Sequence, residues 1–234
     1  MKKIAKVTLT TLFVLAVWSA SSYAGMVSGT VKFDGAAPEA AVISMDADPT
    51  CAGAHSESVL SEEVVVGDAG ALQNVFVYVK EGLEGQTFDT PSTPVTLDQK
   101  GCQYKPHVFG VQVGQPVDII NSDPTLHNVH GLPKNSKEFN LGMPIPGMRV
   151  KRKFDSAEVM VKFKCDVHPW MNAYVGVVSH PFFSTTGSDG SFEIKDLPAG
   201  SYVLEAWHEK YGTQTMNVTV DDAAPQSASF TFTG

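Results

Sequence analysis

Short segments of alternating residues, separated by turns rich in Gly and Pro, most constrain what this chain can fold into. Such segments occur at residues 72–80, 109–113, 117–120 and 159–164. Alternation with a period of two indicates strands, and short strands spaced in this way are typical of antiparallel sandwiches or barrels. No long apolar stripe with a helical period follows residue 24, and residues 138–148, rich in Gly, Pro and Met, are expected to form a connection rather than a strand or helix. We therefore predict an all-β fold.

The first 24 residues have the pattern of a cleavable signal peptide. Three Lys residues precede a short apolar run from Val7 to Trp18, and Ser22-Tyr23-Ala24 places small residues where a signal peptidase reads. The run is too short to span a bilayer comfortably, so we predict cleavage after Ala24, export to the periplasm or beyond, and no membrane span.

The charge of the chain limits its partners. The net charge is −8, and removing the three Lys of the signal peptide makes it −11. An acidic surface disfavours nucleic acid and anionic lipid, and it permits docking to a basic protein. Plain solubility explains the same charge equally well.

Three cysteines, Cys51, Cys102 and Cys165, leave one without a partner after a single bridge forms. Export favours a disulfide between Cys51 and Cys102, with Cys165 as a metal ligand. The alternative is a second metal site, because His55 follows Cys51 and His107 follows Cys102 at short spacings. The sequence leaves this alternative open.

Cys165 directly follows an alternating segment. Because residues two apart in a strand share a face, the residues of this segment that should point together into the core are Val159, Val161, Phe163 and Cys165. This places the thiol at the inner end of a buried strand, where a loop begins at once. A shielded metal thiolate would require such a position.

The residues around Cys165 complete a ligand set. His168 and Met171 follow it in the spacing Cys-x2-His-x2-Met, and His127 lies upstream. Two imidazoles, one thiolate and a weak axial thioether are the ligands of a type 1, or blue, copper centre. We predict one such copper per chain. The remaining histidines have no paired spacing and are not expected to bind metal.

The loop from Cys165 to Met171 resembles the ligand loop of the cupredoxins, and its spacing is most like that of amicyanin. The segment 114–129, with a glycine turn, a strand, Asn121 and then His127-Asn128-Val129, is similar to the upstream part of the same pattern. The resemblance covers about residues 68–178. It implies a Greek-key β-sandwich, type 1 copper and single-electron transfer.

The same resemblance implies roles for neighbouring residues. Asn128 would steady the Cys165 thiolate through its backbone N–H, and Val167, where amicyanin-like loops carry Pro, keeps an additional N–H. His168 would lie at the surface inside an apolar rim for electron transfer. The residues expected in this rim are Pro169, Trp170, Met143 and Met148; inward packing of Trp170 is the alternative.

The C-terminal tail resembles the carboxypeptidase-regulatory-like, transthyretin-like fold. The stretches that carry the resemblance are Thr186 to Phe192 and Leu197 to Tyr202. It implies a small second β-sandwich module at residues 179–234 with a structural or docking role. Four strands are few for a sandwich, so the expected N-terminal region, 25–67, is a candidate to complete it. The cupredoxin part would then be inserted; a tandem is the alternative.

The leading functional hypothesis is a periplasmic carrier of single electrons that is not an enzyme. A complete ligand set leaves no open position for a substrate, and the His pairs of a second catalytic copper do not occur in the sequence. A cytochrome or another oxidoreductase is the expected kind of partner. The alternatives are a copper chaperone or store and an envelope adaptor without an electron-transfer role.

Overall fold

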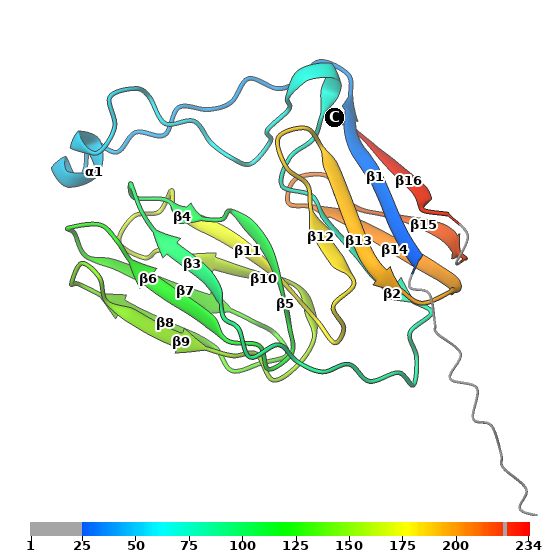
Figure 1. Cartoon of the computed structure of the whole chain (residues 1–234). Helices are drawn as coiled ribbons and strands as arrows, with labels where there is room; N and C mark the ends of the chain where they lie inside the picture. The colour runs from blue at the N-terminus through cyan, green and yellow to red at the C-terminus, as the bar shows by residue number, and fades with distance from the viewer. Residues whose placement is uncertain (1–24, 222–223) are drawn as a thin grey trace, which may run out of the picture.

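The computed structural model describes residues 25–221 and 224–234, so the expected signal peptide lies outside the described residues. Within them, helix is limited to α1 (Pro49–Gly53) and the short 3-10 helix η1 (Asp68–Gly70), and strands dominate. The prediction of an all-β fold is confirmed. Two β-sandwiches lie side by side (Figure 1).

Sandwich I is built from both ends of the described chain. Its two sheets have the strand orders β13–β1–β16 and β12–β2–β14–β15. Its strands are β1 (Gly25–Asp34), β2 (Phe76–Glu81), β12 (Phe183–Thr185), β13 (Ser191–Leu197), β14 (Gly200–His208), β15 (Gly212–Val220) and β16 (Gln226–Thr233). Both sheets contribute to one apolar core, which includes Val31, Leu204 and Phe230. The tail strands therefore obtain their partners from segments far upstream.

Sandwich II lies between β2 and β12 in the sequence. Its sheets have the orders β5–β11–β10–β7–β8 and β4–β3–β6–β9. Its strands are β3 (Val95–Gln99), β4 (Tyr104–Lys105), β5 (Val108–Gln112), β6 (Val117–Asn121), β7 (His127–Leu132), β8 (Phe139–Met143), β9 (Arg149–Arg152), β10 (Glu158–Lys164) and β11 (Asn172–Val178). The chain crosses repeatedly between the two sheets, as a Greek-key sandwich requires.

Two predictions from the sequence need correction, one about a domain boundary and one about a connecting segment. A domain beginning at residue 68 would include β2, but β2 pairs with β12 and β14 of sandwich I. Its side chains are buried on both faces, one against the core of sandwich I and the other against sandwich II, so alternation alone could not assign it. The segment 138–148 was expected to be a plain connection, yet Phe139–Met143 forms β8 beside β7.

The two sandwiches share a small apolar interface. It consists of buried residues from both, Phe76, Tyr78, Val108 and Val178, with half-buried neighbours packed around them. The Phe76 ring lies against two glycines of sandwich II, Gly110 and Gly176. The two sandwiches are thus joined by interlocking side chains as well as by the two chain segments that run between them.

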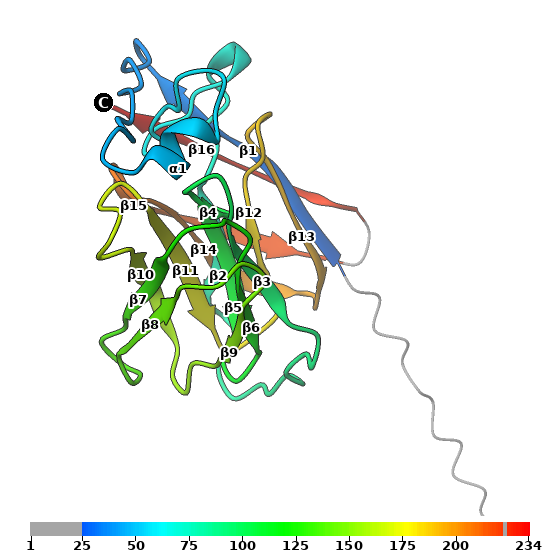
Figure 2. The same cartoon turned by 90° about the vertical axis from the view of Figure 1, so that its left-hand side faces the viewer.

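A long connection between β1 and η1 reaches over one end of sandwich II. It carries α1 and returns to sandwich I before β2 begins (Figures 1 and 2). No helix among the described residues has the length and apolar character needed to cross a membrane.

Candidate metal centre

The expected metal ligands lie at the end of sandwich II that this connection covers. His127 is the first residue of β7, and Cys165 directly follows β10. The antiparallel register pairs Lys164 with His130, so His127, three residues earlier, faces the loop that begins after Lys164. As the alternation predicted, Val161, Phe163 and Cys165 are all buried. Val159, which was expected on the same face, is only half-buried, because the register of β10 shifts between Glu158 and Val161.

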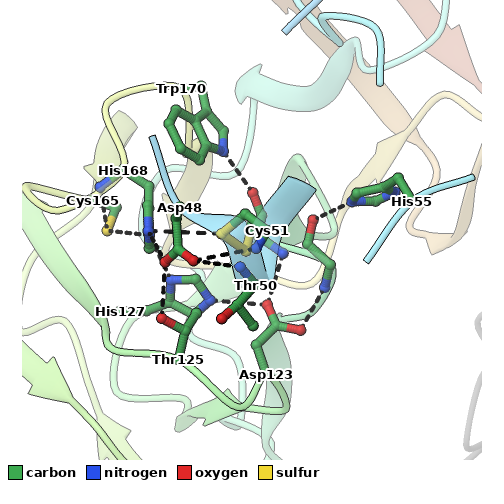
Figure 3. The surroundings of a disulfide bond; sticks show 12 residues. Asp48, Thr50, Cys51, His55, Asp123, Thr125, His127, Cys165, His168 and Trp170 are labelled. Atoms are coloured by element: carbon green, nitrogen blue, oxygen red, sulfur yellow. Dashed lines mark hydrogen bonds and ion pairs between the residues drawn. A yellow bond between two sulfur atoms is a disulfide. The ribbon is translucent and has the colours of Figure 1, made fainter. Parts of the chain in front are cut away.

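Three potential donor atoms converge there. One ligand atom from each of His127, Cys165 and His168 lies within 4.8 Å of the others, and the three residues are 0%, 2% and 3% exposed. The two Nδ1 atoms are 2.9 Å apart, and the Nδ1 of His168 is 4.0 Å from the Cys165 Sγ (Figure 3). Both imidazoles therefore direct the same nitrogen towards the thiol.

The surroundings of Cys165 favour its ionised form. Burial raises the pKa of the thiol, but hydrogen bonds to the sulfur lower it, so the pKa lies below its ordinary value. These contacts come from His127 and from three backbone N–H groups, those of Asn128, His168 and Val167. The backbone donors include the two that the sequence singled out, at Asn128 and Val167.

Asn128 also supports the start of the ligand loop. Its side-chain Oδ1 accepts a hydrogen bond from the Asp166 N–H at 2.7 Å and lies 3.3 Å from the Cys165 Sγ. Its carbonyl oxygen accepts a hydrogen bond from the Tyr104 hydroxyl. The residue thus joins β7 to the loop that holds the thiol.

Met171 closes the ligand loop. It is 1% exposed and packs in the same core cluster as Cys165. The Met171 N–H donates to the His168 carbonyl at 2.9 Å, and the Met171 carbonyl accepts from the Cys165 N–H at 3.1 Å. These two bonds make a tight turn that brings the thioether-bearing residue back beside the thiol-bearing one.

A carboxylate lies at the outer nitrogen of each imidazole. The Asp123 Oδ2 is 2.9 Å from the Nε2 of His127, and the Asp48 Oδ2 is 3.0 Å from the Nε2 of His168. Burial lowers the pKa of His127, but its contacts with Asp123 and Cys165 raise it, with a net result of about 9. Such carboxylate partners orient a ligating imidazole and leave Nδ1 for the metal.

The expected surface rim around His168 is wrong in two respects. His168 is buried, because α1 covers the edge of its ring, and Met143 is 0% exposed and pairs with His127 across β7 and β8. Met148 is half-buried in the core cluster, and Pro169 is exposed. The half-buried Trp170 ring is tilted by 40° to the His168 ring, with the two centroids 5.0 Å apart. Its indole N–H donates to the Cys102 carbonyl, which holds the ring beside the disulfide.

Cys51 and Cys102 form a disulfide, with Cα atoms 5.5 Å apart. Since both sulfurs are bonded to each other, the alternative of a second metal site at these cysteines is not supported. His55 instead contacts the Gly101 carbonyl, and His107 pairs with Glu209 of sandwich I.

Asp48 and Asp123 were not predicted from the sequence as part of the site. Asp123 stands four residues before His127 in a turn, which was a usable signal for a contact with that ring. Asp48 is 120 residues from His168. The Cys51–Cys102 disulfide helps to hold Asp48 near the ligands, but nothing in the sequence placed Cys102 beside the ligand loop.

Comparisons with known proteins give two kinds of match. A family profile described as "Carboxypeptidase regulatory-like domain" matches residues 161–233. The matched stretch contains β12–β16 of sandwich I but also begins within β10 of sandwich II. A search of curated proteins found no match.

Among solved structures, cupredoxins are matched over part of the chain. A purple cupredoxin from Nitrosopumilus maritimus has 24% identity and a TM-score of 0.31, covering 36% of this chain and 98% of that one. A reduced amicyanin variant has 22% identity and a TM-score of 0.33, covering 43% and 97%. A copper-containing nitrite reductase from Thermus scotoductus SA-01 has 22% identity and a TM-score of 0.34, covering 40% of this chain and only 24% of its own.

Proposed function

We propose that this protein carries single electrons on one copper ion held by His127, Cys165 and His168, with Met171 as a weak fourth ligand. The observation that carries the proposal is the convergence of a thiol and two imidazole Nδ1 atoms in a buried cluster. A bound copper would supply the one-electron couple between its oxidised and reduced states.

The donor set fits copper. A thiolate, two imidazoles and a neighbouring thioether are soft to intermediate ligands, which suit a metal that cycles between Cu(I) and Cu(II). The contacts that lower the pKa of Cys165 favour the thiolate form that a metal needs. The carboxylates on both Nε2 atoms hold the rings with Nδ1 facing inward.

Burial favours electron transfer over catalysis at this centre. A catalytic metal keeps a position open to substrate, whereas these three ligand residues are at most 3% exposed. An electron needs no contact between a substrate and the metal. We propose an exported, periplasmic location and a protein redox partner, such as a cytochrome or another oxidoreductase. For sandwich I we propose a structural or docking role.

The test is the visible absorption and EPR spectrum of the purified protein loaded with Cu(II). We expect an intense thiolate-to-copper band with narrow hyperfine splitting, lost in Cys165→Ser because the sulfur donor is removed. His130→Gln is the matched control, since His130 is near the loop but pairs with Glu138 and Asp166. A weak signal with wide splitting that survives Cys165→Ser would overturn the proposal and favour copper handling.

Val167 allows a finer prediction. Its N–H contacts the Cys165 sulfur, and a hydrogen bond there lowers the electron density that the thiolate donates to oxidised copper. Val167→Pro removes this N–H, so we expect a lower reduction potential for the copper-loaded protein. Val167→Ala keeps the N–H and should match the wild type. Voltammetry of the three proteins decides, and an unchanged or higher potential in Val167→Pro would contradict the prediction.

A further inference from the structure

The connection that carries α1 is held over the ligand cluster by a covalent bond. The Cys51–Cys102 disulfide ties α1 to the turn between β3 and β4, and the Cys51 Sγ lies 3.7 Å from the Nε2 of His168 (Figure 3). Cys51 and Cys102 are 0% and 1% exposed. The bridge is thus part of the wall of the metal centre.

On one side of the bridge, Asp48 joins α1 to His168. Asp48 is the N-cap of α1, and its Oδ1 accepts hydrogen bonds from the N–H groups of Thr50 at 2.7 Å and Cys51 at 3.4 Å. Its Oδ2 contacts the Nε2 of His168 and accepts from the Thr125 hydroxyl, each at 3.0 Å. The position of this carboxylate therefore depends on the position of α1.

On the other side, Asp123 joins the disulfide turn to His127. The Asp123 carboxylate accepts hydrogen bonds from the backbone N–H groups of Gly101 and Cys102, both at 2.7 Å. Gly101 and Cys102 have φ values of 64° and 53°, and this left-handed backbone directs two consecutive N–H groups towards one carboxylate. A Cβ at Gly101 would lie 3.0 Å from the His55 ring.

We propose that the Cys51–Cys102 disulfide is a clamp that holds one carboxylate against the outer nitrogen of each histidine ligand, closing the imidazole edge of the centre and favouring oxidised over reduced copper. The closure stands on the contacts above, and the effect on copper rests on the proposed function. Asp48 and Asp123 are positioning residues, since they act through the imidazoles.

The effect on copper follows from charge. A carboxylate that accepts a hydrogen bond from an imidazole makes the ring a stronger donor. Two negative charges beside a partly buried metal also stabilise the more highly charged ion, because attraction is stronger where water is excluded. Both effects favour Cu(II), so removing either negative charge should raise the reduction potential.

Conservative variants test the carboxylates. Asp48→Asn and Asp123→Asn keep a side-chain oxygen but lose the charge, and we expect a higher reduction potential in each copper-loaded variant. Asp46→Asn is the matched control, because Asp46 lies two residues from Asp48 but is exposed and contacts Ser44. Unchanged or lower potentials in both variants would overturn the effect on copper.

A second experiment needs no copper. Reaction of the metal-free full chain with diethyl pyrocarbonate, followed by mass spectrometry, measures how accessible each histidine is, with the more exposed His130 as internal reference. We expect His168 to react slowly in the wild type. It should react about tenfold faster or more in Asp48→Ala and in the double variant Cys51→Ser with Cys102→Ser, because closure is a local equilibrium.

The two experiments separate the possible failures. If the double variant does not fold, Asp48→Ala still tests the clamp. Continued protection of His168 in Asp48→Ala, or in a double variant that is folded by circular dichroism, would overturn the closure. A protein that shows this protection but lacks a type 1 copper spectrum would disprove the proposed function while supporting the clamp as a structural device.

Discussion

Phe76→Ala is expected to destabilise this protein by about 3–5 kcal/mol, the range for removing a large buried aromatic side chain. Phe76 is 0% exposed in the interface between the two sandwiches. A Cβ at Gly110 or Gly176 would lie 2.6 Å or 2.4 Å from atoms of its ring. The two glycines therefore leave room for the Phe76 ring, and the Phe183 ring also lies against Gly110.

Chemical denaturation, followed by far-UV circular dichroism, measures the loss of stability in Phe76→Ala. Removing the ring should also uncouple the sandwiches, so we expect the single transition of the wild type to broaden or to separate into two. Tyr78→Phe is a suitable control, because it keeps a ring at the same interface and removes only the hydroxyl that donates to Glu205. A loss of stability of no more than about 0.5 kcal/mol for Phe76→Ala, the range of ordinary surface substitutions, would contradict the interlocking interface.

His208→Asn is expected to remove a large part of the acid sensitivity of folding. His208 is 1% exposed, and its Nδ1 accepts hydrogen bonds from the N–H groups of Lys210 and Tyr211. Burial lowers the pKa of His208 from 6.5 to about 4. The folded protein therefore keeps this ring neutral where the unfolded chain has already bound a proton.

The sign and the size of the pH effect on stability follow from this difference in protonation. Between pH 6.5 and about 4 the unfolded state binds the extra proton, so stability falls as the pH falls, by about 3 kcal/mol in total for this residue. Asn offers an oxygen near the position of Nδ1 but does not titrate. The unfolding free energies of both proteins, measured by denaturation at pH 7, 5.5 and 4.5, should give a shallower slope for the variant. Parallel slopes of unfolding free energy against pH would show that His208 does not control the acid sensitivity of folding in this pH range.

Local patterns explain why much of the fold could be read from the sequence. Alternation predicted the strand before Cys165 and the buried face that it shares with Val161 and Phe163. The tail strands were predicted by the same rule, since each lies between recognisable turns. Where alternation is obscured, as in β2 with both faces buried, the assignment to a sandwich was wrong.

The candidate site shows a similar division between contacts that are local in the sequence and contacts that are distant. Residues near in sequence, Cys165, His168 and Met171, were brought together by loop spacing, and tight hydrogen bonds within the loop hold that turn. His127 was added from its own neighbourhood in the sequence, and the register of β7 and β10 places it opposite the loop. The cover over His168 depends on distant segments, since Asp48 is 120 residues from His168 and Cys102 is 68 residues from Trp170.

The sequence by itself determined most of the alternating strands, many of the turns and the chemistry of the ligand loop, because these depend on residues only a few positions apart. Only the tertiary structure decided that sandwich II is inserted into sandwich I, and that α1 covers His168 where an exposed ring was expected. Both features depend on long-range pairings, β1 with β16 and Cys51 with Cys102. A local pattern contains no information about which distant partner closes such a loop.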